Sequence, residues 1–270
     1  MAEVTITQFT DPACTWCWGS EPVMRRIKEV YAGEVEMEFV MGGLVEDFDS
    51  FADPANGIEE PGQVASHWRK AAETHRMPVD PSIWREDPPR STYPANRAYR
   101  AAELQGQEKA DRFLRRMREA VCAEAENIER EEVLGRLAEG CGLDRERLVD
   151  DMDSRTVEEL FREDLELAEK KDVSGFPTFW ISSGEEEVWL RGFNRFETFR
   201  EAIEKVSDVE PGENPEVTDF IERYGKVATA EVFEVSDLDE AETLQKLRSL
   251  EREGRVRSLK TGNDYFWISE

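Results

Sequence analysis

The most informative part of the sequence is Asp11-Pro12-Ala13-Cys14-Thr15-Trp16-Cys17-Trp18-Gly19. It follows residues 4–9 (VTITQF), whose alternation of apolar and polar side chains predicts a β-strand. It precedes residues 21–30 (EPVMRRIKEV), where apolar residues recur at helical spacing behind a proline that a first helical turn tolerates. Two cysteines, two residues apart, therefore lie where a strand ends and a helix begins.

The position of the two cysteines has a chemical consequence. The free N–H groups and the positive end of a helix dipole stabilise a thiolate, so we expect the pKa of Cys14 to be lowered. Cys14 would then be the exposed nucleophile, and Cys17 the resolving thiol that attacks a mixed disulfide. No cofactor is needed for this chemistry, because the two cysteines carry the electrons themselves.

The alternative interpretation of the pair is half of a zinc site, which requires two more ligands. The remaining candidates are Cys122, Cys141, His67 and His75. They form no second close pair, so we favour the redox interpretation and expect no metal. We interpret the other two cysteines as buried, inert thiols and the two histidines as ordinary helix residues.

Charge dominates the composition of the 270-residue chain, which carries 61 Asp and Glu against 35 Lys and Arg and a net charge of −26. Acidic residues are spread along the chain, which predicts an acidic, solvated surface suited to concentrated salt and suggests a haloarchaeal source. This charge argues against binding to nucleic acid or to an anionic membrane. No apolar run reaches about 18 residues. Because the chain enters a strand without a signal-peptide pattern, we expect it to be cytoplasmic.

The rest of the chain fits a parallel α/β start followed by a helical insertion. Residues 34–40 alternate as a second strand, and Gly42-Gly43-Leu44 turns the chain. Residues 61–171 are predominantly helical in pattern, with helices expected at 62–76 and around Tyr99, Phe113, Val133 and Leu160. The proline-rich passage 77–94 is expected to be mostly irregular.

A sheet resumes after the insertion. Residues 173–181 (VSGFPTFWI) indicate a loop, a proline and a strand, and a proline is tolerated at the first residue of a strand. Residues 188–190 would be the returning strand of a hairpin, and residues 196–206 a helix with one apolar face. The expected order is thus strand, helix, strand, helical insertion, hairpin and helix.

This order of elements and three motifs resemble the DsbA-like branch of the thioredoxin superfamily, in particular FrnE-type proteins and predicted protein-disulfide isomerases. The motifs are the cysteine stretch at 11–19, Gly42-Gly43-Leu44, and Gly175-Phe176-Pro177-Thr178. The resemblance covers about residues 1–206, and it implies an α/β, thioredoxin-like fold with a large all-helical insertion. It departs from the secreted oxidants of the superfamily in lacking an export signal, and from thioredoxin itself in the Thr15-Trp16 dipeptide, which influences redox poise.

The resemblance also implies roles for residues outside the cysteine pair. Pro177 would be a cis-proline facing the two cysteines, and the backbone of Phe176 would pair with an extended substrate strand. Trp16 and Trp18 are candidates for an apolar landing surface beside Cys14, although Trp18 could equally pack in the core.

Residues 207–215 have the composition of a linker, and residues 216–270 resemble a winged helix. Three short helices are expected there, followed by a hairpin around Thr261-Gly262-Asn263-Asp264. The segment carries eight Lys and Arg against thirteen Asp and Glu, so nucleic-acid binding is unfavourable. We therefore expect a protein-contact or dimerisation module.

The sequence thus predicts a thiol–disulfide oxidoreductase of protein-disulfide isomerase type. Its substrates would be protein or small-molecule thiols and disulfides, with an electron donor that the sequence does not identify. Two alternatives stay open: a non-catalytic protein-binding adaptor of the same fold, and a redox-responsive regulator that uses the C-terminal domain. The direction of exchange, the physiological substrate and the oligomeric state are not specified by these patterns.

Overall fold

The computed structural model describes residues 2–49, 58 and 61–270. Its elements in chain order are β1 (Val4–Thr10), α1 (Thr15–Gly19), α2 (Glu21–Val30), β2 (Val35–Met41), α3 (Pro61–His75), α4 (Ile83–Glu86), α5 (Tyr93–Glu103), α6 (Gln107–Ala123), α7 (Glu131–Gly140), α8 (Arg145–Met152), α9 (Arg155–Lys170), β3 (Thr178–Ser183), β4 (Glu186–Arg191), α10 (Phe196–Val206), α11 (Val217–Tyr224), β5 (Lys226–Ala228), α12 (Thr229–Val235), α13 (Glu240–Arg252), β6 (Val256–Thr261) and β7 (Asp264–Ser269).

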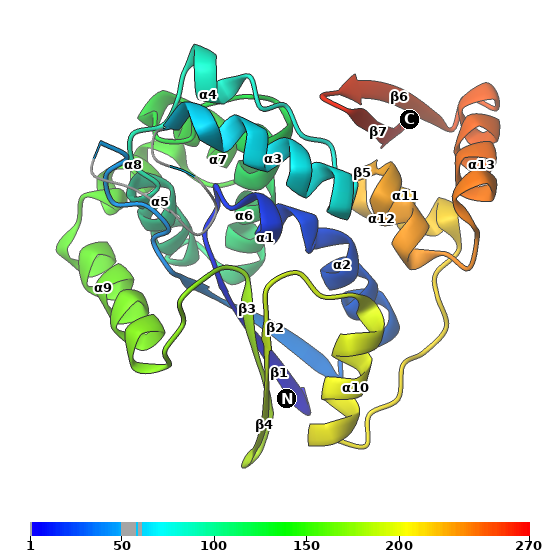
Figure 1. Ribbon diagram of the computed structural model, residues 1–270, viewed down its shortest axis with the longest axis horizontal. Helices are drawn as coiled ribbons and strands as arrows, with labels where there is room; N and C mark the ends of the chain where they lie inside the picture. Colours follow the sequence, from blue (N-terminus) through cyan, green and yellow to red (C-terminus); the bar gives the residue numbers. More distant parts are fainter. Residues whose placement is uncertain (1, 50–57, 59–60) are drawn as a thin grey trace.

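The first four strands form one sheet in the order β2-β1-β3-β4. β1 runs parallel to β2 and antiparallel to β3, and β3 pairs with β4 as a hairpin. The predicted order of strand, helix, strand, helical insertion, hairpin and helix is therefore confirmed. Because β1 is central, the cysteine stretch that follows it lies at the middle of one sheet edge (Figure 1).

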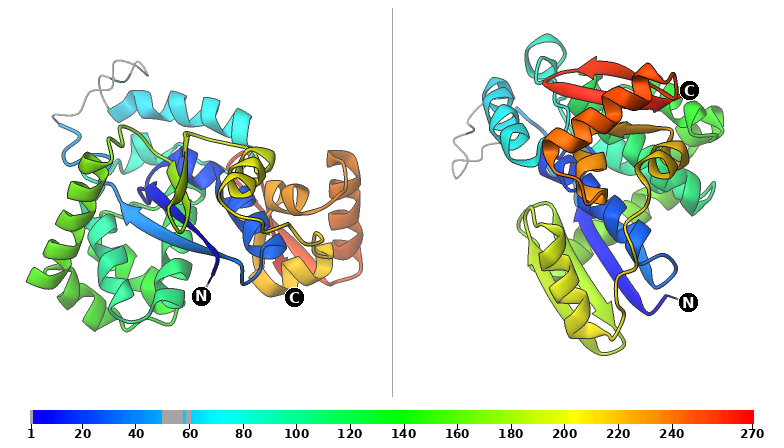
Figure 2. Two further views of the ribbon diagram at one scale, coloured as in Figure 1. Left: turned by 90° about the horizontal axis from the view of Figure 1, so that it is seen from below. Right: turned by 90° about the vertical axis from the view of Figure 1, so that its right-hand side faces the viewer.

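Two helices cover one face of this sheet. Apolar side chains of α2 and α10 pack on Val4, Ile6 and Phe179 of the strands. The views in Figure 2 show α2 between the sheet and the C-terminal elements. The first turn of the helix after the cysteines is set apart as α1, with a break at Ser20, so the helix begins earlier than residue 21.

The insertion between β2 and β3 consists of helices α3 to α9, which share one large apolar core with part of the sheet. The five helices expected from apolar periodicity are present. α4 and α8 were not predicted, and α4 lies within the proline-rich passage expected to be irregular. α8 buries only Leu148 in full, so it has no apolar stripe to reveal it.

Residues 216–270, called here the C-terminal unit, contain the three predicted helices and the predicted hairpin. A third strand, β5, was not predicted; it completes an antiparallel sheet in the order β5-β7-β6. This unit has an apolar core of its own, around Phe220, Leu247 and Trp267. The residues between α10 and α11, including the predicted linker, form no helix or strand.

The C-terminal unit packs directly against the rest of the chain. Phe266 of β7 meets Trp18 with ring centroids 6.3 Å apart. The tip of the hairpin docks on the proline-rich passage, where the Asn263 side-chain oxygen accepts a hydrogen bond from Val79 N at 2.7 Å. A Cβ atom on Gly262 would lie 2.1 Å from Val79 O, so the tip approaches too closely for any larger residue.

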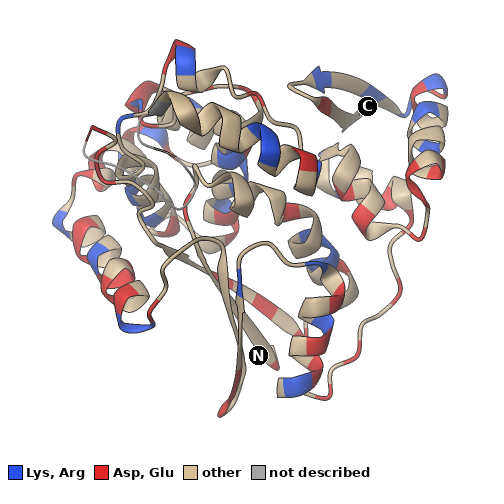
Figure 3. Cartoon of the chain, viewed as in Figure 1, with Lys and Arg blue, Asp and Glu red and all other residues tan. Residues whose placement is uncertain are grey.

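Acidic side chains occur over all parts of the fold (Figure 3). In the C-terminal unit, Arg255, just before β6, pairs with Glu222, and Arg257 of β6 pairs with Glu270, each at 3.0 Å. These pairs occupy two of the basic groups that a nucleic-acid contact would need. None of the helices in the described part of the chain has the length and apolar composition that a span of a lipid bilayer requires.

Candidate active site

Cys14 caps the N-terminus of α1, as the strand–helix junction predicted. Its Sγ accepts a hydrogen bond from the backbone N–H of Cys17 at 3.2 Å. On its other side the thiol donates to the carbonyl oxygen of Phe176, 3.6 Å away. Both cysteines are free thiols, and Cys14 is only 5% exposed rather than openly accessible as expected, because the Phe176 loop covers it.

The buried carboxylate of Asp11 fixes the loop that carries Cys14. It accepts hydrogen bonds from Ala13 N, from Leu44 N and from the side chains of Thr92 and Asn96, at 2.7–2.8 Å. Burial raises the pKa of Asp11, and the four hydrogen bonds oppose that shift. The carboxylate thus joins the first sequence motif to the glycine turn after β2 and to α5.

The glycine turn in turn holds the third motif. The peptide bond between Phe176 and Pro177 is cis, which confirms the expected geometry. The ring of Phe176 lies over Gly42, where a Cβ atom would be 1.9 Å from the ring carbon Cζ. Gly42 N donates to Thr10 O at 2.7 Å, so its backbone is fixed to β1. The three motifs that carried the family resemblance therefore meet around Cys14.

Replacing Gly42 with alanine should displace the Phe176 ring, because the turn cannot move away from β1. We expect a loss of about 1–3 kcal/mol in the free energy of unfolding, together with faster alkylation of Cys14, because the Phe176 loop that covers its thiol is displaced. Urea denaturation and the rate of thiol alkylation would measure the two effects. The control is Gly140→Ala, since no atom of the described residues lies within 4 Å of the new Cβ. Equal effects in both variants would contradict the role of the Gly42 contact.

The electrostatics of the pair differ from the expectation for Cys14. Burial raises the pKa of Cys14 well above its usual value, and the hydrogen bond and charge of Cys17 add to the shift. Burial acts on Cys17 too, but the neighbouring Cys14 thiol and the charge of Arg118 lower its pKa overall. The expected lowered pKa of Cys14 is therefore wrong for this closed geometry, and the two neighbouring thiols titrate as a pair.

A buried guanidinium behind Cys17 explains this distribution. Arg118 of α6 is 2% exposed and donates to the Thr10 hydroxyl oxygen at 2.6 Å. The hydroxyl then bonds to Cys17, so Arg118 acts on the thiolate both through its charge and through Thr10. Burial would raise the pKa of Glu21, but Arg118 and its neighbours hold it at about 2, which keeps the partner of Arg118 ionised. Sequence reasoning missed Arg118, since nothing in the pattern of α6 marks this arginine as buried.

A cavity of about 540 Å³ opens beside Cys14. Trp16 lines it and is half-buried, with its indole N–H donating to Nε2 of His67 at 3.1 Å. Phe176 forms another part of the wall. This placement is compatible with the predicted landing surface at Trp16, and it gives Cys14 a route to a ligand despite its low exposure.

Trp18 does not belong to that surface. It is fully buried, donates its indole N–H to Pro78 O at 2.8 Å, and packs against Phe266 of the C-terminal unit. Trp18 was open to two interpretations, a part of the landing surface or a core residue. The structure favours the core residue, because a fully buried side chain cannot contact a substrate directly. The side chain instead connects the cysteine motif to the C-terminal unit.

His75 also packs behind the motif, against Gly19, and is 4% exposed. Its Nδ1 accepts a hydrogen bond from Met77 N at 3.1 Å. Burial lowers the pKa of His75 to about 4, so the ring is neutral at neutral pH. His75 is therefore a core residue. Cys122 is also fully buried, and burial raises the pKa of its thiol. Within the described ranges, no group of three side chains that could bind a metal ion occurs.

Acid should destabilise the protein through His75. Between pH 6.5 and about 4 the unfolded chain binds a proton at this histidine and the folded protein does not, so the free energy of unfolding falls by about 3 kcal/mol as the pH falls through this window. His75→Asn should flatten the profile there, as measured by urea denaturation at a series of pH values. His67→Asn is the control, and an unchanged slope in His75→Asn would refute the assignment.

Comparison with known proteins agrees with this geometry. A family model described as thioredoxin matches residues 8–201, which includes the cysteine motif and the cis-proline. The ClpXP adapter protein SpxH of Halalkalibacterium halodurans is 31% identical, over 97% of this chain and 87% of its own length. That similarity extends through the C-terminal unit.

Two solved structures share the fold of the first part of the chain. A Nitrosomonas europaea protein described as a disulfide isomerase superposes with a TM-score of 0.65 at 22% identity, over 75% of this chain and 96% of that one. The cytosolic disulfide reductase DsbM of Pseudomonas aeruginosa superposes with a TM-score of 0.57, also at 22% identity, over 69% of this chain and 89% of that one.

Proposed function

Because the chain belongs to the thioredoxin family, we propose that it is a cytoplasmic thiol–disulfide oxidoreductase that works through Cys14 and Cys17. The observation that carries the proposal is the position of the Cys14 thiol, between the backbone N–H of Cys17 and the carbonyl of Phe176, at the wall of a cavity. A thiol placed only for packing would need neither the donor nor access to a cavity.

The charge distribution suggests how exchange begins. As a substrate disulfide approaches, Cys14 passes its proton to the neighbouring Cys17 thiolate and attacks one substrate sulfur. The S–S bond of the substrate breaks, one substrate thiolate leaves, and a mixed disulfide forms at Cys14. Cys17 then loses its proton, aided by Arg118 and Thr10, and attacks the Cys14 sulfur. The substrate leaves as a dithiol, reduced by two electrons, and the protein holds the Cys14–Cys17 disulfide.

The cis-proline loop would hold a substrate segment in place. The backbone N–H of Phe176 has no hydrogen-bond partner within residues 2–49, 58 and 61–270, and the Phe176 side chain is half-buried. An extended peptide could pair with this backbone, as in β-augmentation. Trp16 would then contact the peptide side chains across the cavity, whereas Trp18 supports the motif from behind.

A redox titration tests the proposal directly. The protein is equilibrated in dithiothreitol buffers of graded potential, and the oxidised fraction is read by alkylation and mass spectrometry. We expect one two-electron transition at Cys14–Cys17. A midpoint near that of thioredoxin, about −270 mV, would indicate a reductase, and one near about −120 mV an oxidant. Absence of a reversible transition would refute the oxidoreductase proposal.

A second candidate is favoured by one specific observation. The relatives that match across 97% of the chain, and so include the C-terminal unit, are named ClpXP adapter proteins. We therefore also propose that the chain is an adaptor that presents a partner protein to a protease. In this proposal the winged-helix-like C-terminal unit is the part that contacts another protein. A redox-responsive form of this adaptor would use the contact between Trp18 and Phe266, which joins the cysteine motif to that unit.

A further inference from the structure

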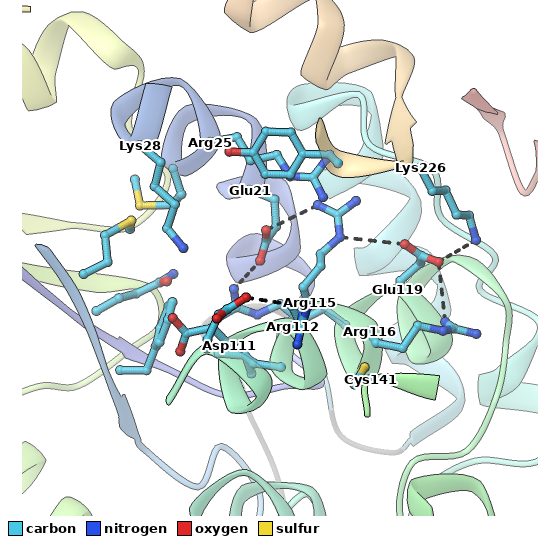
Figure 4. A pocket seen from close by; sticks show the side chains of 18 of the residues that line it. Glu21, Arg25, Lys28, Asp111, Arg112, Arg115, Arg116, Glu119, Cys141 and Lys226 are labelled. Carbon is cyan, nitrogen blue, oxygen red and sulfur yellow. Dashed lines mark hydrogen bonds and ion pairs between the residues drawn. The ribbon is translucent and has the colours of Figure 1, made fainter. Parts of the chain in front are cut away.

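A second cavity, of about 600 Å³, lies between α2, α6 and the start of the C-terminal unit (Figure 4). Its floor is apolar and is made by Met24, Met37, Phe39 and Leu114. Its walls are polar, and in Figure 4 the amine of Lys28 and the guanidinium of Arg112 approach the space from opposite helices. Neither cysteine of the active site lines this cavity.

One residue of the floor has no structural explanation within the fold. Gln8 of β1 is fully buried and lines the cavity, and neither its amide nitrogen nor its amide oxygen has a hydrogen-bond partner among the described residues. Its neighbours in the sheet register are Phe39 and Phe179, which offer no side-chain partner. A buried, unpaired amide is costly, and almost all buried polar groups in native proteins are paired.

The polar walls are unusual for a chain with a net charge of −26. Eight basic and four acidic residues line the cavity. Many of the basic groups are held by acids: Arg25 and Arg115 pair with Glu231, Lys226 with Glu124 and Arg223 with Glu29. Because these basic groups already pair with acidic side chains of the protein, they are not free to bind an added anion.

Three donors in the walls are not committed in this way. Lys28 has no ion-pair partner within the described part of the chain (Figure 4). Nε of Arg118 has no hydrogen-bond partner there, although the same guanidinium pairs with Glu21 through another nitrogen. Among the residues that the structure describes, the one ion pair of Arg112 is a long, exposed contact with Glu108 at 3.6 Å. The cavity thus combines an excess of donors with an amide that can donate and accept at once.

We propose that this cavity is a binding site for a small organic anion that contains an amide group, such as a short acidic peptide or an N-acylated acidic amino acid. Gln8 would pair with the ligand amide through both of its free atoms. Lys28 and Arg112 would bind the carboxylates, and the hydrocarbon part would lie on the apolar floor. The proposal does not depend on the function of the cysteines.

Calorimetric titration with N-acetyl-L-glutamate, at constant ionic strength, tests the proposal. We expect saturable binding with one site, and at least tenfold weaker binding of glutarate, which lacks the amide, and of inorganic phosphate. Gln8→Leu should weaken N-acetyl-L-glutamate binding at least tenfold. The same variant should unfold at an equal or higher temperature in the absence of ligand, because leucine removes the unpaired amide.

Lys28→Met, at an exposed position, should also weaken binding, and Lys246→Met on α13 is the matched control expected to bind as the unaltered protein does. The double variant Cys14→Ser/Cys17→Ser should retain binding, which separates this site from the active site. The proposal would be overturned if N-acetyl-L-glutamate showed no saturable binding, or if Gln8→Leu bound it as tightly as the unaltered protein does. In either case the cavity would be filled by water rather than by an anion that contains an amide. Tight binding of phosphate with no preference for the amide would overturn the assigned ligand class.

Discussion

Replacing Cys14 with serine is expected to abolish disulfide exchange completely, down to the background of the buffer. A hydroxyl is not a nucleophile toward disulfides near neutral pH, and the mixed disulfide that begins the reaction requires a sulfur atom at residue 14. The fold should survive, since serine can still accept the hydrogen bond from Cys17 N. The measurement is the rate of reduction of a peptide disulfide, with the reductant supplied in excess.

Cys17→Ser should behave differently, because the first attack remains possible and the second does not. We expect a stable mixed disulfide between Cys14 and the substrate, detectable by mass spectrometry. Cys122→Ala is the control: this buried thiol lies on α6 and takes no part in the proposed reaction. Exchange at the normal rate in Cys14→Ser would exclude the mechanism.

The same variants separate the enzyme from the adaptor. A protein-binding adaptor should hold its partner equally well when both Cys14 and Cys17 are serine, whereas an oxidoreductase loses its activity. A third outcome is that the partner stays bound to the unaltered protein but dissociates from the double serine variant. In that case the cysteines regulate the contact, which would support the redox-responsive form of the adaptor.

Glu231→Gln should cause the largest loss of stability among single substitutions outside the cysteine site. The Glu231 carboxylate is fully buried on α12 and lies between Arg25, at 3.0 Å, and Arg115. Removing its charge leaves two buried guanidinium groups side by side, and breaking a buried pair in this way costs about 3–5 kcal/mol. Urea denaturation would measure the loss, and limited proteolysis within residues 207–215 would show whether the C-terminal unit has loosened.

Glu234→Gln on the same helix is the matched control. Glu234 pairs with Arg26 at 3.3 Å, and both side chains are more than a fifth exposed. Because both side chains still reach solvent, the pair contributes about 1 kcal/mol, less than the fully buried pairs of Glu231. If the two variants were equally stable, the buried charges around Glu231 would not be what holds the C-terminal unit in place.

Much of the fold could be predicted because its elements have strong periodicity. Ile6 lies on the apolar face of β1 and Ile27 on the apolar face of α2. These two faces pack together in the core, and both side chains are fully buried. β5 escaped prediction for a physical reason: three residues, Lys226–Ala228, carry no pattern, and they become a strand only by pairing with β7. The assignment of domains and the halophilic source remain predictions from composition and pattern.

The candidate site could be predicted only where its residues form a short motif in the sequence. The pair Cys14 and Cys17 and the cis-proline are such cases. Arg118 and Thr10 are more than a hundred residues apart in the chain, and only the packing of α6 against the end of β1 brings them to Cys17. A helix dipole can be inferred from sequence and predicts a lowered pKa for Cys14, whereas the burial of the thiol and the guanidinium of Arg118 cannot be inferred.

The position of β1 in the sheet has a consequence for synthesis of the protein. Its antiparallel neighbour, β3, begins at Thr178, which pairs with Phe9 about 170 residues earlier in the chain. At about 5–20 residues per second, a ribosome needs roughly 10–30 s to complete that segment. Throughout this interval one edge of the central strand is unpaired and open to other nascent chains. The long helical insertion therefore delays closure of the sheet, and a chaperone that shields β1 should raise the yield of folded protein.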